Sequence, residues 1–418
     1  MSVTNSQMRT RFLDYVERKK KEVFKLCSDL IQIPSENPPG DTTEIAKFLR
    51  DFLERNGVSV REYEPKKGSP NVLGRIGQGD ERNIVFSGHM DVLPAGKGWD
   101  DPPFSGRISG GKILGRGACD MKTGLTAALT TLLAASKFEK DLAGRFTICL
   151  VSDEETGGNW GTKWMVDNVP EASGTACIIG EPGGIDVVPI GEKGIFWIRL
   201  KASGQAAHGA YDVLGDNAIL TMCRALPEVV KMRNVKGRIP RDLVSLIDEE
   251  RPYVEDRYGK GVGDVLTRVS VSPGVIAGGE ALNMVAENCG AEVDMRLPIG
   301  VSTKKAQKLL RGLLLDANLT NVKPEVMVMS DPNYTSPEQA FVEVVRSNVR
   351  RVIRKEPKLI IKLGATDGRY YRLGGVPTVT YGPGIYNMSR ANEYVPLEEL
   401  LTISKVYGGV VSDYLGQG

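Results

Sequence analysis

The 418-residue sequence predicts an α/β fold, in which a mostly parallel sheet carries helices on both faces, together with an inserted α+β two-layer sandwich. Three observations predict it. The chain is longer than one ordinary hydrophobic core requires and suits two domains. Short, almost uninterrupted apolar segments alternate with helical patterns, which is typical of buried parallel strands. From Lys193 onward apolar and polar residues alternate instead, so a second domain is expected to begin there.

The first domain begins with two predicted helices. Apolar side chains recur at near-helical spacing through residues 10–34. A second helix follows Pro39 and Gly40, where Asp41 or Thr42 can cap its N-terminus. Three apolar strands then alternate with two helices, at residues 83–89, 123–135, 146–152, 160–168 and 176–180.

The second domain has its own order of elements. The pattern predicts strand, helix, two strands, helix and strand, at residues 195–201, 217–232, 267–275, 290–296, 303–318 and 323–329. This order is typical of a small α+β sandwich inserted in a larger domain. A helix at 337–355 and an apolar strand at 376–381 then complete the large sheet. We therefore assign residues 1–193 and 332–418 to the first domain and 194–331 to the inserted one.

Composition excludes several classes of protein. A formal net charge of +2 argues against electrostatic binding to nucleic acid or to an anionic membrane. No apolar run approaches the roughly 20 residues that span a bilayer. The six cysteines show no Cys-x-x-Cys spacing, which argues against a disulfide framework and a thiolate zinc site. A cytoplasmic compartment is expected.

Acidic and imidazole groups follow three of the predicted apolar strands. His89 ends the first strand, the Glu154-Glu155 pair follows the second, and Glu181 follows the third. Because ligands gather beyond the carboxyl ends of parallel strands, these groups are expected to converge on one site. Each has an ordinary alternative when taken alone, since polar loops and surface acid pairs are common.

Two further carboxylates fit such a site. Asp91 lies two residues after His89, and a nearby carboxylate commonly orients a metal-binding imidazole. Asp120 precedes a helix, where it can bridge two cations or simply cap the helix. Adjacent acids repel one another, so a packed site needs cations or protons to hold them. In the interpretation that follows, Glu155 binds metal and Glu154 takes the proton of the attacking water.

Together, these motifs resemble one metallopeptidase family over nearly the whole chain. That family includes acetylornithine deacetylase, succinyl-diaminopimelate desuccinylase, aminoacylase and carboxypeptidase G. The resemblance implies a zinc-exopeptidase-like first domain, with His89 and Glu181 on one zinc ion and Glu155 on a second. It further implies that Asp120 bridges the two ions, that Glu154 is the general base and that Asp91 orients His89. Cobalt or manganese can substitute for zinc.

The resemblance extends to the substrate-binding residues. The segment Ala202–Ala210 resembles the family segment whose histidine, here His208, polarises the scissile carbonyl, often across a dimer interface. Asn283 and Arg296 resemble the family's substrate-recognition pair, and a guanidinium fork suits a substrate carboxylate. The loops containing Thr366 and Gly384 resemble the family's remaining substrate-binding loops. The inserted domain is accordingly expected to act as a lid and to mediate a homodimer.

One position departs from the family pattern. Relatives place a histidine four residues before the glutamate equivalent to Glu393, and this chain has Ser389 there. A serine hydroxyl is a poor zinc ligand compared with imidazole. The sequence leaves open whether one or two ions bind, and whether water, Asn387, Asn392 or Glu393 replaces the histidine.

The leading hypothesis is metal-dependent hydrolysis of an amide bond next to a free carboxylate, as in the deacylation of an N-acetyl or N-succinyl amino acid. A carboxypeptidase or dipeptidase of the same family is the first alternative. A catalytically weak relative kept for ligand binding is the second, because of Ser389. A nucleotide-binding enzyme is excluded, since the glycines between Gly74 and Gly79 lack the Gly-x-Gly-x-x-Gly spacing.

Overall fold

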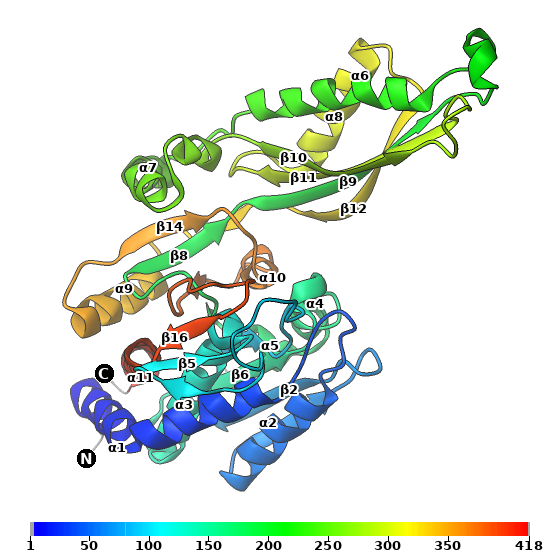
Figure 1. Ribbon diagram of the computed structural model, residues 1–418. Coiled ribbons are helices and arrows are strands. Elements are labelled where there is room, and N and C mark those ends of the chain that lie inside the picture. Colours follow the sequence, from blue (N-terminus) through cyan, green and yellow to red (C-terminus); the bar gives the residue numbers. More distant parts are fainter. Residues whose placement is uncertain (1–3, 80, 417–418) are drawn as a thin grey trace. The chain divides into compact units, whose positions relative to one another are not determined.

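The computed structural model describes residues 4–79 and 81–416. The chain forms two compact units (Figure 1). Unit 1 comprises residues 1–190, 335–360 and 366–418, and unit 2 comprises residues 191–334 and 361–365.

Unit 1 is built on a six-stranded sheet with the strand order β1-β2-β6-β3-β7-β15. Its strands are β1 (Ser59–Tyr63), β2 (Asn71–Gly77), β3 (Asn83–His89), β6 (Arg145–Val151), β7 (Ala176–Ile179) and β15 (Thr378–Thr380). The last four strands of this order run parallel, whereas β1 and β2 pair antiparallel at one edge. The prediction of a mostly parallel sheet is therefore confirmed. The antiparallel edge was not anticipated.

Helices cover both faces of this sheet. Successive residues of β3 point to opposite faces: Val85 packs in a core with α4, α5 and α10, whereas the Phe86 ring contacts the Tyr407 ring of α11. The helices of unit 1 are α1 (Asn5–Gln32), α2 (Thr43–Arg55), α3 (Thr123–Ser136), α4 (Thr162–Asn168), α5 (Pro170–Ser173), α9 (Ala340–Ile353), α10 (Gly368–Leu373) and α11 (Leu397–Leu415). At the start of α2, Asp41 rather than Thr42 supplies the side-chain oxygen, which accepts from the Thr43 N–H at 3.0 Å.

Two small sheets accompany the large one. One has the order β16-β5-β4, with β4 (Ile108–Ser109), β5 (Lys112–Leu114) and β16 (Tyr394–Pro396). The other has the order β13-β8-β14, with β8 (Val187–Glu192), β13 (Asn333–Tyr334) and β14 (Lys358–Lys362), and it contains residues at which the chain passes from one unit to the other.

Unit 2 is a four-stranded antiparallel sheet in the order β10-β11-β9-β12, with helices on one face. Its elements are β9 (Gly194–Ser203), α6 (Ala218–Val230), α7 (Val244–Tyr258), β10 (Ser270–Gly278), β11 (Asn288–Leu297), α8 (Thr303–Asp316) and β12 (Val322–Ser330). Alternate residues of β9 and β11 are buried beneath α6 and α8, which confirms the predicted two-layer sandwich. Helix α7 was not predicted, because charged residues interrupt its apolar pattern.

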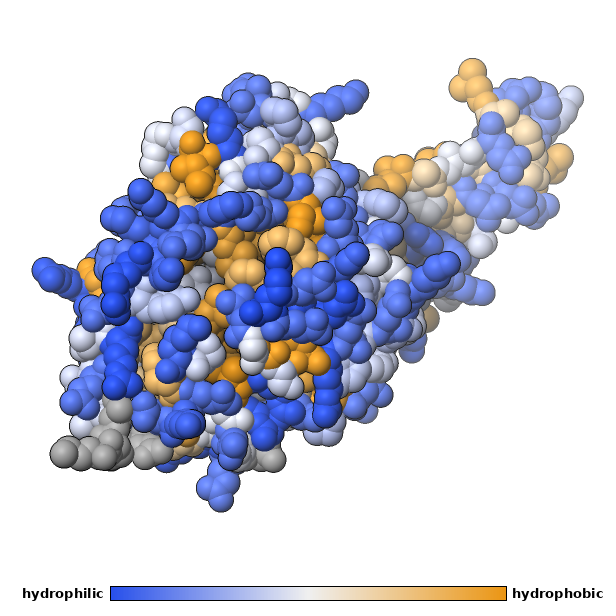
Figure 2. Space-filling view, turned by 90° about the horizontal axis from the view of Figure 1, so that it is seen from below, coloured by the Kyte–Doolittle hydropathy of each residue, from blue (hydrophilic) through white to orange (hydrophobic). Residues whose placement is uncertain are grey.

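Among the described residues, no helix is long and apolar enough to cross a membrane. Figure 2 shows unit 1 from below the view of Figure 1, with hydrophilic side chains covering much of this face and smaller hydrophobic areas between them.

Candidate active site

The parallel strands of unit 1 deliver the candidate residues to one edge of the sheet. His89 is the last residue of β3, Glu154 and Glu155 form a short turn after β6, and Glu181 follows β7. Because these strands are neighbours with the same direction, their carboxyl ends lie side by side. The convergence expected from the strand pattern is present.

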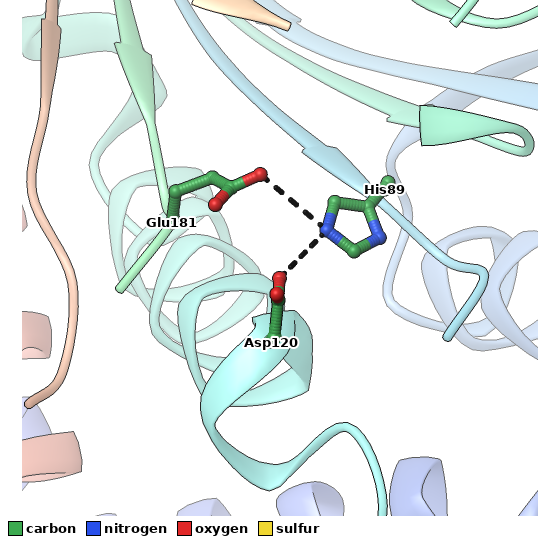
Figure 3. Close-up of side chains that lie close together, drawn as sticks. All are labelled: His89, Asp120 and Glu181. Atoms are coloured by element: carbon green, nitrogen blue, oxygen red, sulfur yellow. Dashed lines mark hydrogen bonds and ion pairs between the residues drawn. The ribbon is translucent and has the colours of Figure 1, made fainter. Parts of the chain in front are cut away.

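His89, Asp120 and Glu181 form a compact cluster of potential metal ligands (Figure 3). One ligand atom from each lies within 4.8 Å of the other two. His89 Nε2 is 3.0 Å from an oxygen of Asp120 and 3.5 Å from an oxygen of Glu181. The sequence-predicted ligands of one ion are therefore together.

The hydrogen bonding of His89 suits metal binding. Its Nδ1 lies 2.8 Å from the backbone oxygen of Asp91, and a carbonyl oxygen can only accept. In the neutral ring Nδ1 therefore carries the hydrogen, and the Nε2 lone pair is available to a metal ion held with the two carboxylates. Nitrogen and carboxylate donors of this kind fit a zinc ion, and a hydrogen-bonded second ring nitrogen is usual for a ligating histidine.

Asp120 is presented by a short π-helical turn, η1 (Ala118–Lys122). The Glu393 carboxylate accepts from the backbone N–H of Cys119 at 2.7 Å and of Asp120 at 3.3 Å. Its other oxygen pairs with Arg116 at 2.6 Å, and both side chains are buried. Glu393 and Arg116 thus hold the turn that carries Asp120.

A close glycine contact joins the end of β7 to the start of α3. A Cβ atom on Gly124 would lie 2.0 Å from the backbone oxygen of Gly180. Only glycine permits this approach, which helps to hold the strand end before Glu181 near the turn that carries Asp120.

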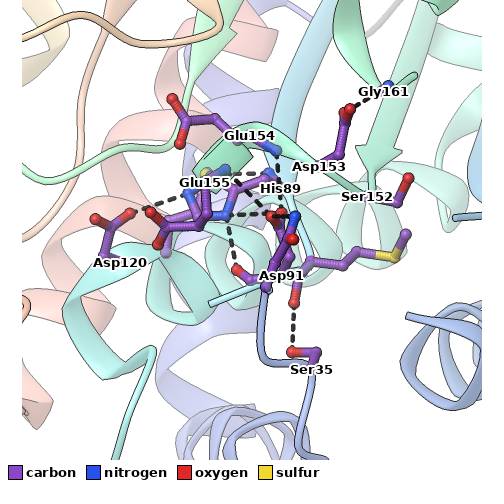
Figure 4. Close-up of polar contacts among 12 residues, drawn as sticks. Ser35, His89, Asp91, Asp120, Ser152, Asp153, Glu154, Glu155 and Gly161 are labelled. Atoms are coloured by element: carbon purple, nitrogen blue, oxygen red, sulfur yellow. Dashed lines mark hydrogen bonds and ion pairs between the residues drawn. The ribbon is translucent and has the colours of Figure 1, made fainter. Parts of the chain in front are cut away.

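The Asp91 carboxylate supports the loop after β6 (Figure 4). Its oxygens accept from the backbone N–H groups of Glu154 and Glu155, both at 3.2 Å, and from the Asn37 amide at 2.9 Å. An Asp91 oxygen lies farther from His89 Nδ1, at 3.4 Å. Asp91 therefore orients His89 mainly through its backbone oxygen, and its side chain fixes the loop that carries the acid pair.

Several buried acidic side chains lie close together at this site. Burial raises the pKa of Glu154 well above its usual value, and the charge of Glu181 raises it further. Burial also raises the pKa of Glu155 to about 8, with Asp120 adding to the effect. Burial alone would lower the pKa of His89, but hydrogen bonds with the surrounding carboxylates raise it well above 6.5. So many buried acids suit a site that holds a cation.

A buried polar network holds the loop after β6 from its other side. Arg369 Nη2 and the Tyr370 hydroxyl both donate to the backbone oxygen of Gly157, at 2.9 and 2.5 Å. Asp367 accepts from the Thr162 hydroxyl at 2.6 Å. The predicted substrate-binding residue Thr366 is itself fully buried, and its hydroxyl accepts from the Gly368 N–H at 3.1 Å.

The loop after β15 contains Gly384 and Ser389. Gly384 is buried, and its N–H donates to the Glu399 carboxylate at 2.7 Å. Ser389 is exposed and has a backbone φ of 63°. The three side chains considered as replacements for the expected histidine all make other contacts, namely Asn387 with the Asn392 backbone, Asn392 with Asp100, and Glu393 with Arg116.

Unit 2 brings His208 and Asn283 together. The Gly209 N–H donates to the backbone oxygen of Asn283 at 2.8 Å, and His208 forms a β-bridge with Met284. His208 Nδ1 accepts from the Ala210 N–H at 3.1 Å. A neutral imidazole in this arrangement carries its hydrogen on Nε2, so the free edge of the ring is a hydrogen-bond donor.

Arg296 lies at the opposite end of the same sheet. It pairs with Ile195 at the start of β9, whereas Asn288 pairs with Ser203 at the end of β9. Arg296 donates to both Asp294 oxygens, at 2.8 and 3.2 Å, and its guanidinium lies 5.4 Å from the centre of the Trp197 ring. Its planar fork is therefore held in one orientation.

Sequence reasoning missed the residues that support this site. Asn37, Arg116 and Arg369 were not singled out, and Glu393 was considered only as a replacement ligand. Glu393 and Arg116 are 277 residues apart, so no local pattern links them. A buried ion pair between distant loops becomes visible only once the fold is known.

Comparisons with known proteins show which family this chain resembles. The model of peptidase family M20/M25/M40 matches residues 85–413. Succinyl-diaminopimelate desuccinylase from Paracoccus denitrificans is 25% identical over 401 residues, which cover 93% of this chain and 97% of that protein.

Solved structures show the same fold. An M20 family metallo-carboxypeptidase from Sulfolobus solfataricus gives a TM-score of 0.81 at 20% identity, over 94% of this chain and 99% of that one. A dipeptidase from Saccharomyces cerevisiae gives 0.76 at 16% identity, over 99% of both chains. The resemblance drawn from the sequence motifs is confirmed. The chain belongs to peptidase family M20/M25/M40.

Proposed function

We propose that this chain is a metal-dependent hydrolase that cleaves an amide bond next to a free carboxylate, as in an N-acyl amino acid or a dipeptide. The observation that carries the proposal is the cluster of His89, Asp120 and Glu181 beside a loop that bears Glu154. The three clustered ligands of the first ion, with the buried Glu154 carboxyl beside them, support an active enzyme over a ligand-binding relative.

His89, Asp120 and Glu181 would hold the first zinc ion, and Glu155 would contribute to a second ion that shares Asp120. Zinc supplies Lewis-acid polarisation of the scissile carbonyl when bound there. Cobalt or manganese would fit the same nitrogen and oxygen donors.

Glu154 is proposed as the general acid–base group. It takes the proton of the attacking water and returns it to the leaving amine as the C–N bond breaks. Asp91 serves this step indirectly, because its carboxylate fixes the backbone of Glu154. His208 is proposed to donate its Nε2 hydrogen to the carbonyl oxygen as negative charge develops there.

Arg296 is proposed to bind the free carboxylate of the substrate. Asp294 and Trp197 orient its fork, and the Trp197 indole N–H also donates to Asp294 at 2.7 Å. Asn283, which lies beside His208, is proposed to contact the substrate near the scissile bond, and Thr366 and Gly384 are proposed to shape the binding loops.

Substitution of Arg296 tests the proposed carboxylate recognition. Arg296→Lys is expected to lower kcat/KM about tenfold or more for substrates with a free carboxylate, because lysine lacks the bidentate fork. The measurement is kcat/KM on matched pairs of free-acid and methyl-ester substrates. Arg199→Lys in the same sheet is a suitable control, since Arg199 pairs with Glu292 at an exposed position. Equal losses on both substrates would assign Arg296 another role.

The named relatives differ in the group that is removed from the amide. The relative from Paracoccus is named a desuccinylase, whereas the solved structures include a carboxypeptidase and a dipeptidase. A panel of N-acetyl, N-succinyl and dipeptide substrates, each assayed with zinc, cobalt and manganese, tests the proposed function. Absence of hydrolysis across the panel with metal-loaded protein would contradict it.

A homodimer is proposed because the substrate-binding residues of unit 2 lie far apart in one chain. Asn288 begins β11 and Arg296 is its second-last residue, and a rise of about 3.3 Å per residue separates their Cα atoms by roughly 26 Å. His208 and Asn283 lie at the Asn288 end. One small substrate cannot span this distance, so His208 and Arg296 are proposed to reach the same substrate from two different chains.

Mixing two inactive variants tests this arrangement. Glu154→Gln and His208→Ala are each expected to be nearly inactive as homodimers. A dimer of one copy of each contains one intact site if His208 acts on the partner's substrate, so an equal mixture should recover about a quarter of wild-type activity. The measurement is activity after the variants are denatured together and refolded. No recovery, despite mixed dimers demonstrated by tagged copies, would place His208 in its own chain's site.

A further inference from the structure

Two segments of unit 2 surround His208 and Asn283, and they are called here the loop pair (residues 204–216 and 279–287). Backbone hydrogen bonds join the two segments, including Gly204 N–H to Glu287 O at 2.7 Å and Val285 N–H to Ala207 O at 2.8 Å. The loop pair is therefore one surface rather than two independent loops. Any group that contacts His208 also meets the side chains around it.

The side chains of the loop pair are largely apolar. Several are exposed although they are large and hydrophobic, namely Tyr211, Val213, Leu214, Leu282 and Met284. The Tyr211 ring lies 5.8 Å from the His208 ring, measured between centroids. Leu282, which directly precedes Asn283, is fully exposed. Large apolar side chains exposed beside polar groups are typical of a binding surface.

A cavity of about 330 Å³ lies against the same surface. It is lined mainly by small and apolar residues, including Ala206, Met284 and Val285, and by the carboxylates Glu280 and Glu287. Met284 connects the cavity to His208, with which it forms a β-bridge. A cavity of this size can accept an acyl group or an amino-acid side chain.

The charge of the loop pair is negative. It contains Asp212, Asp216, Glu280 and Glu287, and neither segment contains a lysine or an arginine. A succinyl group would bring a carboxylate to this surface, where the loop pair offers no lysine or arginine to pair with it. Placing like charges next to each other disfavours binding, and desolvating an unpaired carboxylate adds to the cost.

We infer that the loop pair selects the group on the far side of the scissile amide from the carboxylate bound by Arg296, and that it favours an apolar group without a carboxylate over a succinyl group. The inference rests on the proposed function, in which His208 contacts the scissile carbonyl. The inferred preference differs from the activity for which the desuccinylase relative is named. The substrate class is an N-acyl amino acid with an apolar acyl group, or a dipeptide with an apolar first residue.

A matched pair of substrates tests the inference. N-succinyl and N-(4-methylpentanoyl) derivatives of one amino acid differ only in that an isopropyl group replaces the carboxylate. The apolar compound is expected to have a kcat/KM about tenfold higher or more. Equal or better hydrolysis of the succinyl compound would overturn the inference while supporting the proposed amide hydrolysis.

Binding measurements distinguish failure of the inference from failure of the proposed function. If neither compound is hydrolysed, the wider substrate panel decides the proposed function, and calorimetry on the zinc-loaded protein still decides the inference. A lower Kd for the 4-methylpentanoyl compound supports it. Equal affinities, or tighter binding of the succinyl compound, overturn it.

Substitution of Leu282 tests whether the preference for the apolar compound arises from the loop pair. Leu282→Lys is expected to shift the ratio of kcat/KM, or of affinity, about tenfold toward the succinyl compound, because it supplies the missing cation. Leu315→Lys is the matched control, since Leu315 is an exposed leucine on α8, outside the loop pair, and its substitution should leave the ratio unchanged. If Leu282→Lys instead dissociates the dimer in sedimentation and leaves the ratio unchanged, the exposed side chains serve subunit contact and the inference is wrong.

Discussion

Glu154→Gln is expected to lower kcat by about 10²–10⁴-fold, since the amide cannot accept the water proton and general base catalysis typically contributes that much. Glutamine fills nearly the same volume as glutamate. The backbone of residue 154 should also stay in place, because Asp91 binds its N–H rather than its side chain. The measurement is kcat at saturating substrate together with the metal content of the purified variant.

Glu155→Gln is the matched comparison. The two glutamates are adjacent, both backbone N–H groups bind Asp91, and both carboxyls have raised pKa values. Their proposed roles differ, however, because only Glu155 is proposed as a metal ligand. Glu154→Gln should therefore keep the metal content of the wild type, whereas Glu155→Gln should lose part of it. Retention of more than about a tenth of the wild-type rate by Glu154→Gln would exclude the general-base role.

The sequence predicted the large sheet because its strands are buried on both faces. Segments such as Ile84–Phe86 and Phe146–Val151 are almost entirely apolar, and a polar group at the end of such a run marks the edge of the sheet. The same pattern placed His89 and Glu181 at one edge. Strand β2 was missed although it is largely buried, because glycine and arginine interrupt its short apolar run.

The contacts that hold the site could not be predicted in the same way. Glu393 binds the backbone beside Asp120, and Arg369 binds the backbone of Gly157, from positions more than 200 residues away along the chain. Side chains that bind backbone groups leave no signature in local spacing. Asp91 shows a related difficulty, since its position near His89 in the sequence suggested contact between the two side chains. Its carboxylate instead accepts mainly from backbone N–H groups of the loop after β6.

Ser389 is expected to limit the site to nearer one tightly bound metal ion per chain than two. The ligand atoms of His89, Asp120 and Glu181 lie together, whereas the second ion would have Glu155 and a shared Asp120 without an imidazole. Two of the side chains considered as replacements are held elsewhere: Asn392 by Asp100, and Glu393 by Arg116 and the Cys119 N–H. Metal analysis after dialysis against a chelator measures the retained ions, and added zinc or cobalt should stimulate the dialysed enzyme.

Ser389→His should raise the retained metal toward two ions per chain, because imidazole is a far better zinc ligand than a hydroxyl. The backbone at residue 389 has a φ of 63°, a region in which asparagine and histidine are less disfavoured than most residues. Ser389→Asn is therefore the matched control, since it suits the same backbone without adding an imidazole, and it should retain metal as the wild type does. If the wild type already holds two ions through dialysis, another group completes the second site. Asn387 would then be the first residue to substitute, because its contact with the Asn392 backbone uses only the amide nitrogen.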